Sequence, residues 1–195
     1  MQAFRKVWLT ALVAAVLVSL APVQAETTWA KVKAKAAGAK DYTVLYKYDG
    51  PSGVFDFDYR FAGDKVRTEI TAAPKDASRR GTILVFDKSW AADKIRAKTG
   101  GGMIVRNLSH KDVTGKPFYQ SLFGMIIKQA SALGAPKVKA AGDKTLFTFG
   151  SGASTYKIWA NDKAEIVKTE RKDGRELEVR EFLTHNWDTS PSMGF

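Results

Sequence analysis

Few residues of this chain are spaced for catalysis or for binding a metal. The two histidines, His110 and His185, are far apart in the sequence, there is no cysteine, and no HxxxH or HExxH motif occurs. Zinc sites usually draw on such closely spaced ligands, so a zinc site has weak support. We therefore predict no metal and no cofactor.

Hydrolytic chemistry has equally little support. Gly150-Ser151-Gly152 lacks the flanking residues of a nucleophile elbow. A Ser–His–acid triad could still assemble from distant residues, and it would need His110 or His185 beside a serine and a carboxylate. Asp56 and Asp58 share a strand face as a carboxylate pair would, but charges that alternate with aromatic residues more often form a solvated face. We predict that the protein is not an enzyme.

The segment 54–70 has the clearest structural pattern. Its apolar and charged residues alternate on both sides of Gly63-Asp64, so a β-hairpin with one apolar face and one charged face is predicted. The residues of the apolar face are Phe55, Phe57, Tyr59 and Phe61 before the turn and Val66, Thr68 and Ile70 after it. This face must be covered, either by helices of the same chain or by a ligand.

Two segments have helical spacing. In 27–36, Thr27 or Thr28 can cap a short helix, and the apolar residues recur every three or four positions. The second helix is predicted over 117–133, because Pro117 suits a first turn and Gly134-Ala135-Pro136 supplies a stop. The second helix is apolar around most of its circumference. It must therefore be buried on two sides or form a lid over an apolar cavity.

The remaining chain consists of short alternating segments separated by turn residues. With the hairpin, about ten strands are expected. Gly100-Gly101-Gly102 is interpreted as a hairpin turn, since no Gly-Lys-Ser/Thr follows as in a phosphate loop. The fold class is α+β, mainly β: an antiparallel sheet curved around helical cover. Either a closed, packed barrel or an open cavity for an acyl chain would use the aromatic residues.

The first residues indicate export. Arg5 and Lys6 precede an uncharged run that ends in Val23-Gln24-Ala25, the layout of a secretory signal peptide. We predict a signal peptide over 1–25 and a single mature domain over 26–195 in the periplasm. Without Arg5 and Lys6 the chain has 29 basic and 20 acidic residues, about +9. This positive charge either favours an anionic membrane surface as a partner or only reflects a solvated polar face. Export argues against nucleic acid as a partner.

Four segments together resemble the LolA-type outer-membrane lipoprotein-sorting proteins, over most of 28–188. They are Thr114–Phe118, Tyr156–Asp162, Glu165–Lys168 and His185–Asp188. The resemblance implies an open antiparallel half-barrel, covered by an N-terminal helix and a lid helix. Its cavity accepts a lipoprotein acyl chain or another lipid during transfer across the periplasm.

By the same resemblance, the apolar hairpin face and the lid helix line the cavity. The implied ligand-binding residues are Phe55, Phe57, Tyr59, Phe61, Phe118, Leu122, Phe123, Ile126 and Trp159. Arg60 and Arg67 are both candidates for the arginine that ties down the lid in this family. A C-terminal extension of the carrier is not recognised after Pro191, which favours a cargo other than a lipoprotein. The missing cysteine argues against the membrane-anchored LolB-type receptor.

The sequence thus predicts a monomeric periplasmic carrier for a lipid, a lipoprotein acyl chain or a similar amphiphile. Its partners would be this cargo and a transfer protein of the outer or inner membrane. The alternative is a non-catalytic interaction or sensor module, similar to the N-terminal part of RseB, whose barrel is fully packed.

Overall fold

A computed structural model describes residues 27–90, 94–99, 104–109 and 120–195. These ranges contain helices α1 (Trp29–Gly38) and α2 (Leu122–Ser131) and the 3₁₀ turn η1 (Ala77–Arg79). The first strands are β1 (Asp41–Gly50), β2 (Gly53–Ala62), β3 (Lys65–Ala72), β4 (Ile83–Asp87), β5 (Lys94–Thr99) and β6 (Ile104–Ser109). The later strands are β7 (Lys137–Ala141), β8 (Lys144–Ser151), β9 (Ser154–Ala160), β10 (Ile166–Asp173) and β11 (Glu176–Trp187).

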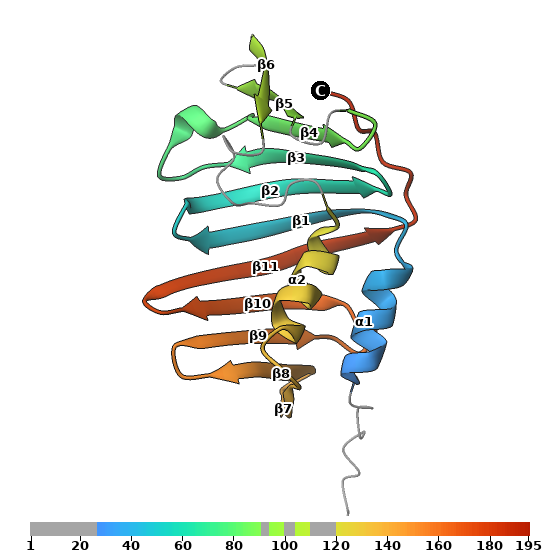
Figure 1. Cartoon of the computed structure of the whole chain (residues 1–195), viewed down its shortest axis with the longest axis vertical. Coiled ribbons are helices and arrows are strands. Elements are labelled where there is room, and N and C mark those ends of the chain that lie inside the picture. The colour runs from blue at the N-terminus through green and yellow to red at the C-terminus, as the bar shows by residue number, and fades with distance from the viewer. Residues whose placement is uncertain (1–26, 91–93, 100–103, 110–119) are drawn as a thin grey trace, which may run out of the picture.

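The described strands form a single antiparallel sheet with the spatial order β6-β5-β4-β3-β2-β1-β11-β10-β9-β8-β7. The chain winds from the centre to one edge through β1–β6. It continues through α2 to the opposite edge and returns to the centre, where β11 pairs with β1 (Figure 1). Tyr42 lies opposite Trp187 and Tyr48 opposite Arg180 in this central pair. The sheet ends at β6 and β7 and does not close, so the predicted open antiparallel sheet with helical cover is confirmed.

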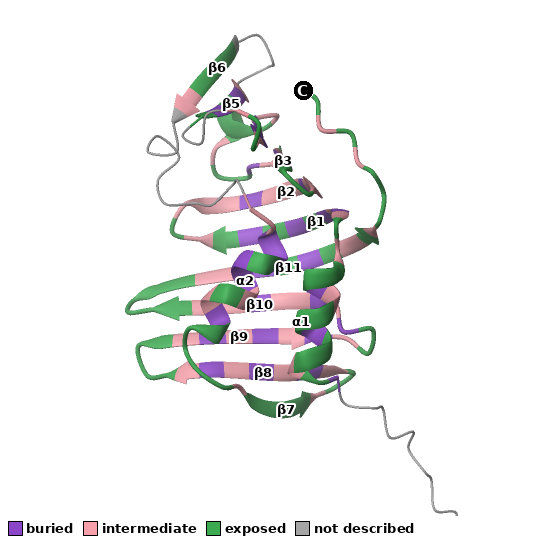
Figure 2. Ribbon diagram, turned by 45° about the vertical axis from the view of Figure 1, so that its right-hand side comes forward, coloured by how far each residue is buried: buried purple, intermediate pink, exposed green. Residues whose placement is uncertain are grey.

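Both helices lie on the same face of the sheet, which we call the inner face; the other is the outer face (Figure 1). Side chains alternate between the two faces along each strand. On β1 the residues Tyr42, Val44, Tyr46 and Tyr48 are all buried on the inner face. Figure 2 shows buried residues recurring along the strands that the helices cross.

Helix α1 confirms the predicted N-terminal helix. The Thr28 side chain accepts a hydrogen bond from the Lys31 amide at 3.3 Å and caps the first turn. Trp29 anchors the helix to β8, with its ring centroid 4.9 Å from that of Phe149 and 5.5 Å from that of Phe147. Aromatic contacts thus fix α1 over the β8 end of the inner face.

The predicted bounds of the second helix are wrong at both ends. Helix α2 begins at Leu122 because Ser121 caps it, its hydroxyl oxygen accepting from the Gly124 amide at 3.1 Å. Residues 117–119 lie outside the described residues. The helix ends at Ser131, and Gly134 follows with a φ of +102°, which glycine adopts without steric cost.

The sequence prediction also missed β7. Its residues, KVKAA, are almost all exposed, so they lack the alternation that marks a half-buried strand. Lysines on an unpaired edge strand are typical of sheets that avoid edge-to-edge aggregation. Within the described ranges neither helix is long and apolar enough to cross a membrane.

Candidate functional site

An aromatic wall covers the inner face at the centre of the sheet. The pairing of β1 with β2 sets Tyr46 opposite Phe57 and Tyr42 opposite Phe61, with ring centroids 5.0 and 5.3 Å apart. Phe55 and Tyr59 are buried, whereas Phe57 and Phe61 are half-buried. The apolar hairpin face predicted from the sequence therefore faces the helices.

Helix α2 packs its predicted residues against this wall. Leu122, Phe123 and Ile126 are all buried. Phe123 points into the sheet, and its ring centroid lies 5.1 Å from that of Tyr42, 5.3 Å from that of Phe182 and 5.4 Å from that of Trp187. Phe118, the remaining lid candidate, lies outside the described residues.

Trp159 lies on the outer face of β9. Its neighbours Ile158 and Ala160 are buried on the inner face, whereas Trp159 is half-buried, with the Lys168 amino group 5.4 Å from its ring centroid. The sheet therefore separates Trp159 from the other proposed ligand-binding residues. Its aromatic side chain suggested a position in the cavity, but side chains alternate between the two faces along β9, and this alternation places Trp159 on the outer face.

The two arginines proposed as lid tethers also lie on the outer face. Arg60 donates to Asp58 at 2.7 Å and to the Ser192 carbonyl at 3.1 Å. Arg67 donates to Glu69 at 2.7 Å and to the Gly194 carbonyl at 2.8 Å. Both guanidinium groups thus hold the C-terminal segment against the outer face, on the side of the sheet away from α2.

Two tyrosines tie α2 to the sheet instead. The Tyr59 hydroxyl donates to the Gln120 carbonyl at 2.7 Å and accepts from the Leu122 amide at 3.1 Å. The Tyr42 hydroxyl lies 3.0 Å from Ser121 Oγ and accepts from the Phe123 amide at 3.4 Å. The first amides of a helix have no partner within it, so these hydroxyl groups complete the N-terminus of α2.

Burial keeps both tyrosines neutral. Desolvation raises the pKa of Tyr42 to about 12 and raises the pKa of Tyr59 well above its ordinary value. Sequence reasoning missed this role because a tyrosine at an inward strand position is ordinary core. The available signal was the hydroxyl group itself, which a buried tyrosine must satisfy.

His185 and Glu165 form a second polar group beneath the helices. The His185 ring contacts both Phe123 and Trp187, with centroid distances of 5.8 and 5.9 Å, and its Nε2 lies 2.8 Å from the Ile166 carbonyl oxygen. Trp187 donates to Glu165 at 2.8 Å. Among the described residues, no three His, Asp or Glu side chains are grouped to hold a metal.

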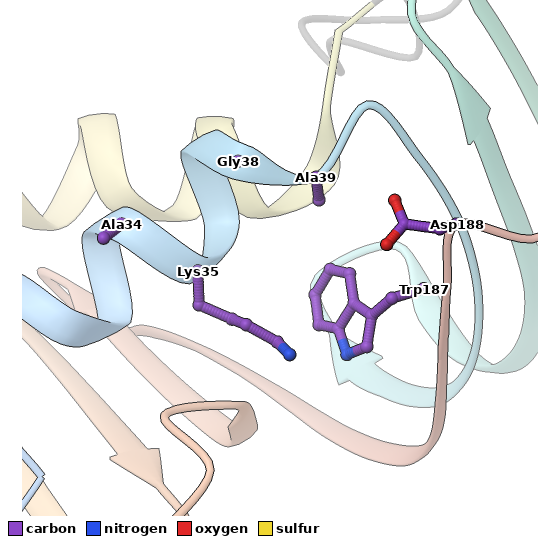
Figure 3. A pocket seen from close by; sticks show the side chains of 6 residues that line it. All are labelled: Ala34, Lys35, Gly38, Ala39, Trp187 and Asp188. Carbon is purple, nitrogen blue, oxygen red and sulfur yellow. The ribbon is translucent and has the colours of Figure 1, made fainter.

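A hollow of about 260 Å³ lies between α1 and the end of β11 (Figure 3). It is lined by Ala34, Lys35, Gly38, Ala39, Trp187 and Asp188. The Lys35 amino group lies 5.1 Å from the Trp187 ring centroid and gives the hollow a cationic side. This hollow flanks α1 and includes none of the proposed ligand-binding residues.

Neither a protein-family model nor a curated protein matches this sequence. The lipoprotein LppX of Mycobacterium tuberculosis is similar in structure at a TM-score of 0.48 and 12% identity, over 85% of this chain and 97% of LppX. A domain assigned to the outer-membrane lipoprotein-sorting proteins in Vibrio parahaemolyticus gives 0.39 and 10%, over 83% of this chain and 93% of that one.

Pseudomonas aeruginosa MucB, in its complex with MucA, gives a TM-score of 0.42 and 12% identity, over 84% of this chain and 57% of that chain. At these identities and TM-scores the likenesses carry no conclusion about function. The fold that the resemblance to LolA-type proteins implied, an open antiparallel sheet with helices on one face, is the fold of this chain.

Proposed function

We propose that the protein is a non-catalytic periplasmic carrier that holds the acyl chain of a lipid or lipoprotein against its inner face. The observation that supports this most directly is the apolar surface that continues beyond α2. Phe57, Phe61, Ile70 and Leu84 lie on the inner face of β2, β3 and β4, and all are only partly buried. A contiguous apolar surface that is not fully buried favours binding of an apolar partner.

Helix α2 is suited to act as the lid. It is a short helix whose apolar side faces the wall, and its first amides donate hydrogen bonds to the hydroxyl groups of Tyr42 and Tyr59, which hold its N-terminus. Each such bond contributes about 1 kcal/mol net, and exposing the buried Phe123 and Ile126 to water costs about 1.5–3 kcal/mol for each side chain, so a ligand that covers both would offset most of the cost of opening. Detachment would expose Phe123 and Ile126 together with the wall beneath them.

Export and the basic charge support the cellular part of the proposal. The predicted signal peptide over 1–25 would deliver the domain 26–195 to the periplasm, where carriers of apolar chains are needed between two membranes. The excess of lysine and arginine favours brief contact with anionic membrane surfaces. A transfer partner in either membrane remains part of the proposal.

Native mass spectrometry tests this function. The full chain would be expressed with its own N-terminal segment, purified from the periplasm without detergent, and weighed intact. We expect a polypeptide that begins after Ala25, plus an excess mass of lipid size. Phe57→Asp protein that still folds should lose the excess mass. Leu183→Asp is the matched control, because Leu183 on β11 is 56% exposed.

The packing of Phe123 favours a second candidate, an interaction module with a filled interior. Its ring contacts those of Tyr42, Phe182, His185 and Trp187, so no space is left at this point beneath α2. A bare polypeptide mass, from protein that also fails to take up added fatty acid, would overturn the carrier and support this candidate.

A further inference from the structure

A buried ion pair interrupts the apolar inner face. Arg180 of β11 is only 8% exposed, and its Nη1 lies 2.5 Å from Oε1 of Glu178. Arg180 lies opposite Tyr48 on β1 and opposite Thr169 on β10, so it sits at the centre of the sheet. Removing charges from water is costly, and a buried pair usually compensates through additional hydrogen bonds.

The chain contains a second buried arginine with which this pair can be compared. Arg67 is 6% exposed and also pairs with a glutamate two residues away, Glu69, but on the outer face. Its Nε donates to the Gly194 carbonyl oxygen and its Nη2 to Glu69. Arg67 leaves only its Nη1 buried without a hydrogen-bond partner, whereas Arg180 leaves both its Nε and its Nη1, the latter although it lies 2.5 Å from Glu178 Oε1.

Two further buried donors that lack an aligned hydrogen bond lie beside Arg180. The hydroxyl groups of Tyr156 on β9 and Thr169 on β10 are buried and close enough to interact with each other, but neither makes an aligned hydrogen bond. Thr169 is directly opposite Arg180, and Tyr156 is opposite Arg171, the next inward residue of β10. Buried polar groups are normally satisfied, so a group of such donors indicates an acceptor that comes from outside the chain.

The charges of Arg180 and Glu178 indicate which chemical class of acceptor this group of donors suits. Glu178 neutralises Arg180: its Oε1 lies against Nη1 without an aligned hydrogen bond, and its Oε2 accepts from the Tyr48 hydroxyl at 3.2 Å. If Oε1 and Nη1 are assigned to each other, Arg180 Nε and the two hydroxyl groups remain as donors. A neutral pair with free donors suits an oxygen that carries little or no charge, such as a carbonyl. Next to Arg180 along the inner face, Phe182 and Tyr46 continue into the aromatic wall, with ring centroids 5.6 Å apart.

We propose that Arg180, Tyr156 and Thr169 form a polar subsite that binds the acyl carbonyl oxygen of the ligand, an ester or a carboxylic acid, while its chain lies along the aromatic wall. The inference rests on the proposed carrier function. Glu178 also lines a small hollow of about 30 Å³ with Pro51, Arg171, Asp173 and Glu176, at the tips of the strands. The polar end of the ligand would therefore lie near the rim of the sheet and its chain further in.

Displacement of a fluorescent apolar dye by three probes of equal chain length tests the subsite. Methyl dodecanoate offers a neutral ester carbonyl and dodecanoate offers the oxygens of an ionised carboxylate, whereas dodecyl methyl ether offers neither. We expect the wild-type protein to bind at least one carbonyl probe about tenfold more tightly than the ether, since one hydrogen bond to a charged donor is lost. The stronger of the two carbonyl probes identifies the source as ester or acid.

The informative variant is Glu178→Gln/Arg180→Met, which removes both charges and leaves no unpaired one buried. It should bind the ether as the wild type does and lose the preference for a carbonyl. Arg67→Met/Glu69→Gln is the matched control on the outer face and should keep the preference. If the first variant fails to fold, Arg180→Lys retains the ion pair but lacks Nε, and it should show the same loss.

The outcomes separate this inference from the proposed function. A carbonyl preference that persists in both Arg180 variants would overturn the subsite and assign the ion pair a structural role. Equal binding of all three probes by the wild type would overturn the subsite while leaving the carrier function supported. Failure of every probe and of the dye to bind would overturn both.

Discussion

His185 is the described residue whose charge is most closely coupled to the lid, because its ring stacks against Phe123 of α2. Burial lowers the pKa of His185, although the hydrogen bond to the Ile166 carbonyl and the nearby Glu165 oppose this shift. Lys35 acts in the same direction as burial. The neutral ring, with its Nε2 donating to Ile166, is therefore the form that fits beneath α2.

The lowered pKa predicts how stability depends on pH. The unfolded chain, with an ordinary histidine pKa of about 6.5, binds the proton more readily than the folded protein. The contribution of His185 to stability is therefore complete above about pH 6.5 and is lost as the pH falls toward its folded pKa. Urea unfolding should show a lower free energy of unfolding at pH 5.5 than at pH 7.5.

His185→Gln should reduce this pH dependence, because glutamine does not titrate. The chain has only one other histidine, His110, so His110→Gln is the matched control and should retain the dependence. An unchanged pH dependence in His185→Gln protein would show that other groups cause it.

At the scale of elements, α2 is held at its N-terminus by side chains of the sheet. Tyr59→Phe removes the donor to Gln120 and the acceptor of the Leu122 amide while preserving the ring. Loss of these bonds should destabilise the protein by about 1–2 kcal/mol in urea unfolding. It should also speed hydrogen exchange at the Leu122 amide, since the first turn of the lid is released.

Tyr46→Phe provides the comparison for this experiment. Tyr46 is also buried on the inner face, but its ring packs against Phe57 and Phe182 rather than against α2. Exchange at the Leu122 amide should be unaffected in this variant. Equal exchange rates in the two variants would contradict a specific role of Tyr59 in holding the lid.

At the scale of the whole molecule, the sheet is open and ends at β6 and β7. Lys137 and Lys139 are exposed on β7, and charged side chains on an edge discourage pairing with another copy. Lys137→Val/Lys139→Val protein should therefore aggregate faster, measured by light scattering. Lys31→Val/Lys33→Val on α1, with the same loss of charge away from an edge, should stay dispersed. Equal aggregation of the two would indicate that net charge, not the edge, is responsible.

The prediction of strands from the sequence succeeded where one face is buried and the other is not. The alternation over 54–70 placed Phe55 and Tyr59 on one face and Asp58 and Arg60 on the other, and the structure retains this division. Both helices were located in the sequence, since their apolar spacing is local. Strand β7 was missed because an exposed edge strand has no such alternation.

The sequence by itself determined which side chains share a face of a strand or helix. This grouping depends only on a period of two or of 3.6 residues within a short segment of the chain. Only the tertiary structure decided what each face meets. Strands β1 and β11 pair and place Tyr42 opposite Trp187. The tertiary structure also decided that tyrosines of the sheet hold the lid, that Arg60 and Arg67 bind the C-terminal segment, and that Arg180 is buried. These contacts join residues far apart in the chain, so no local pattern encodes them.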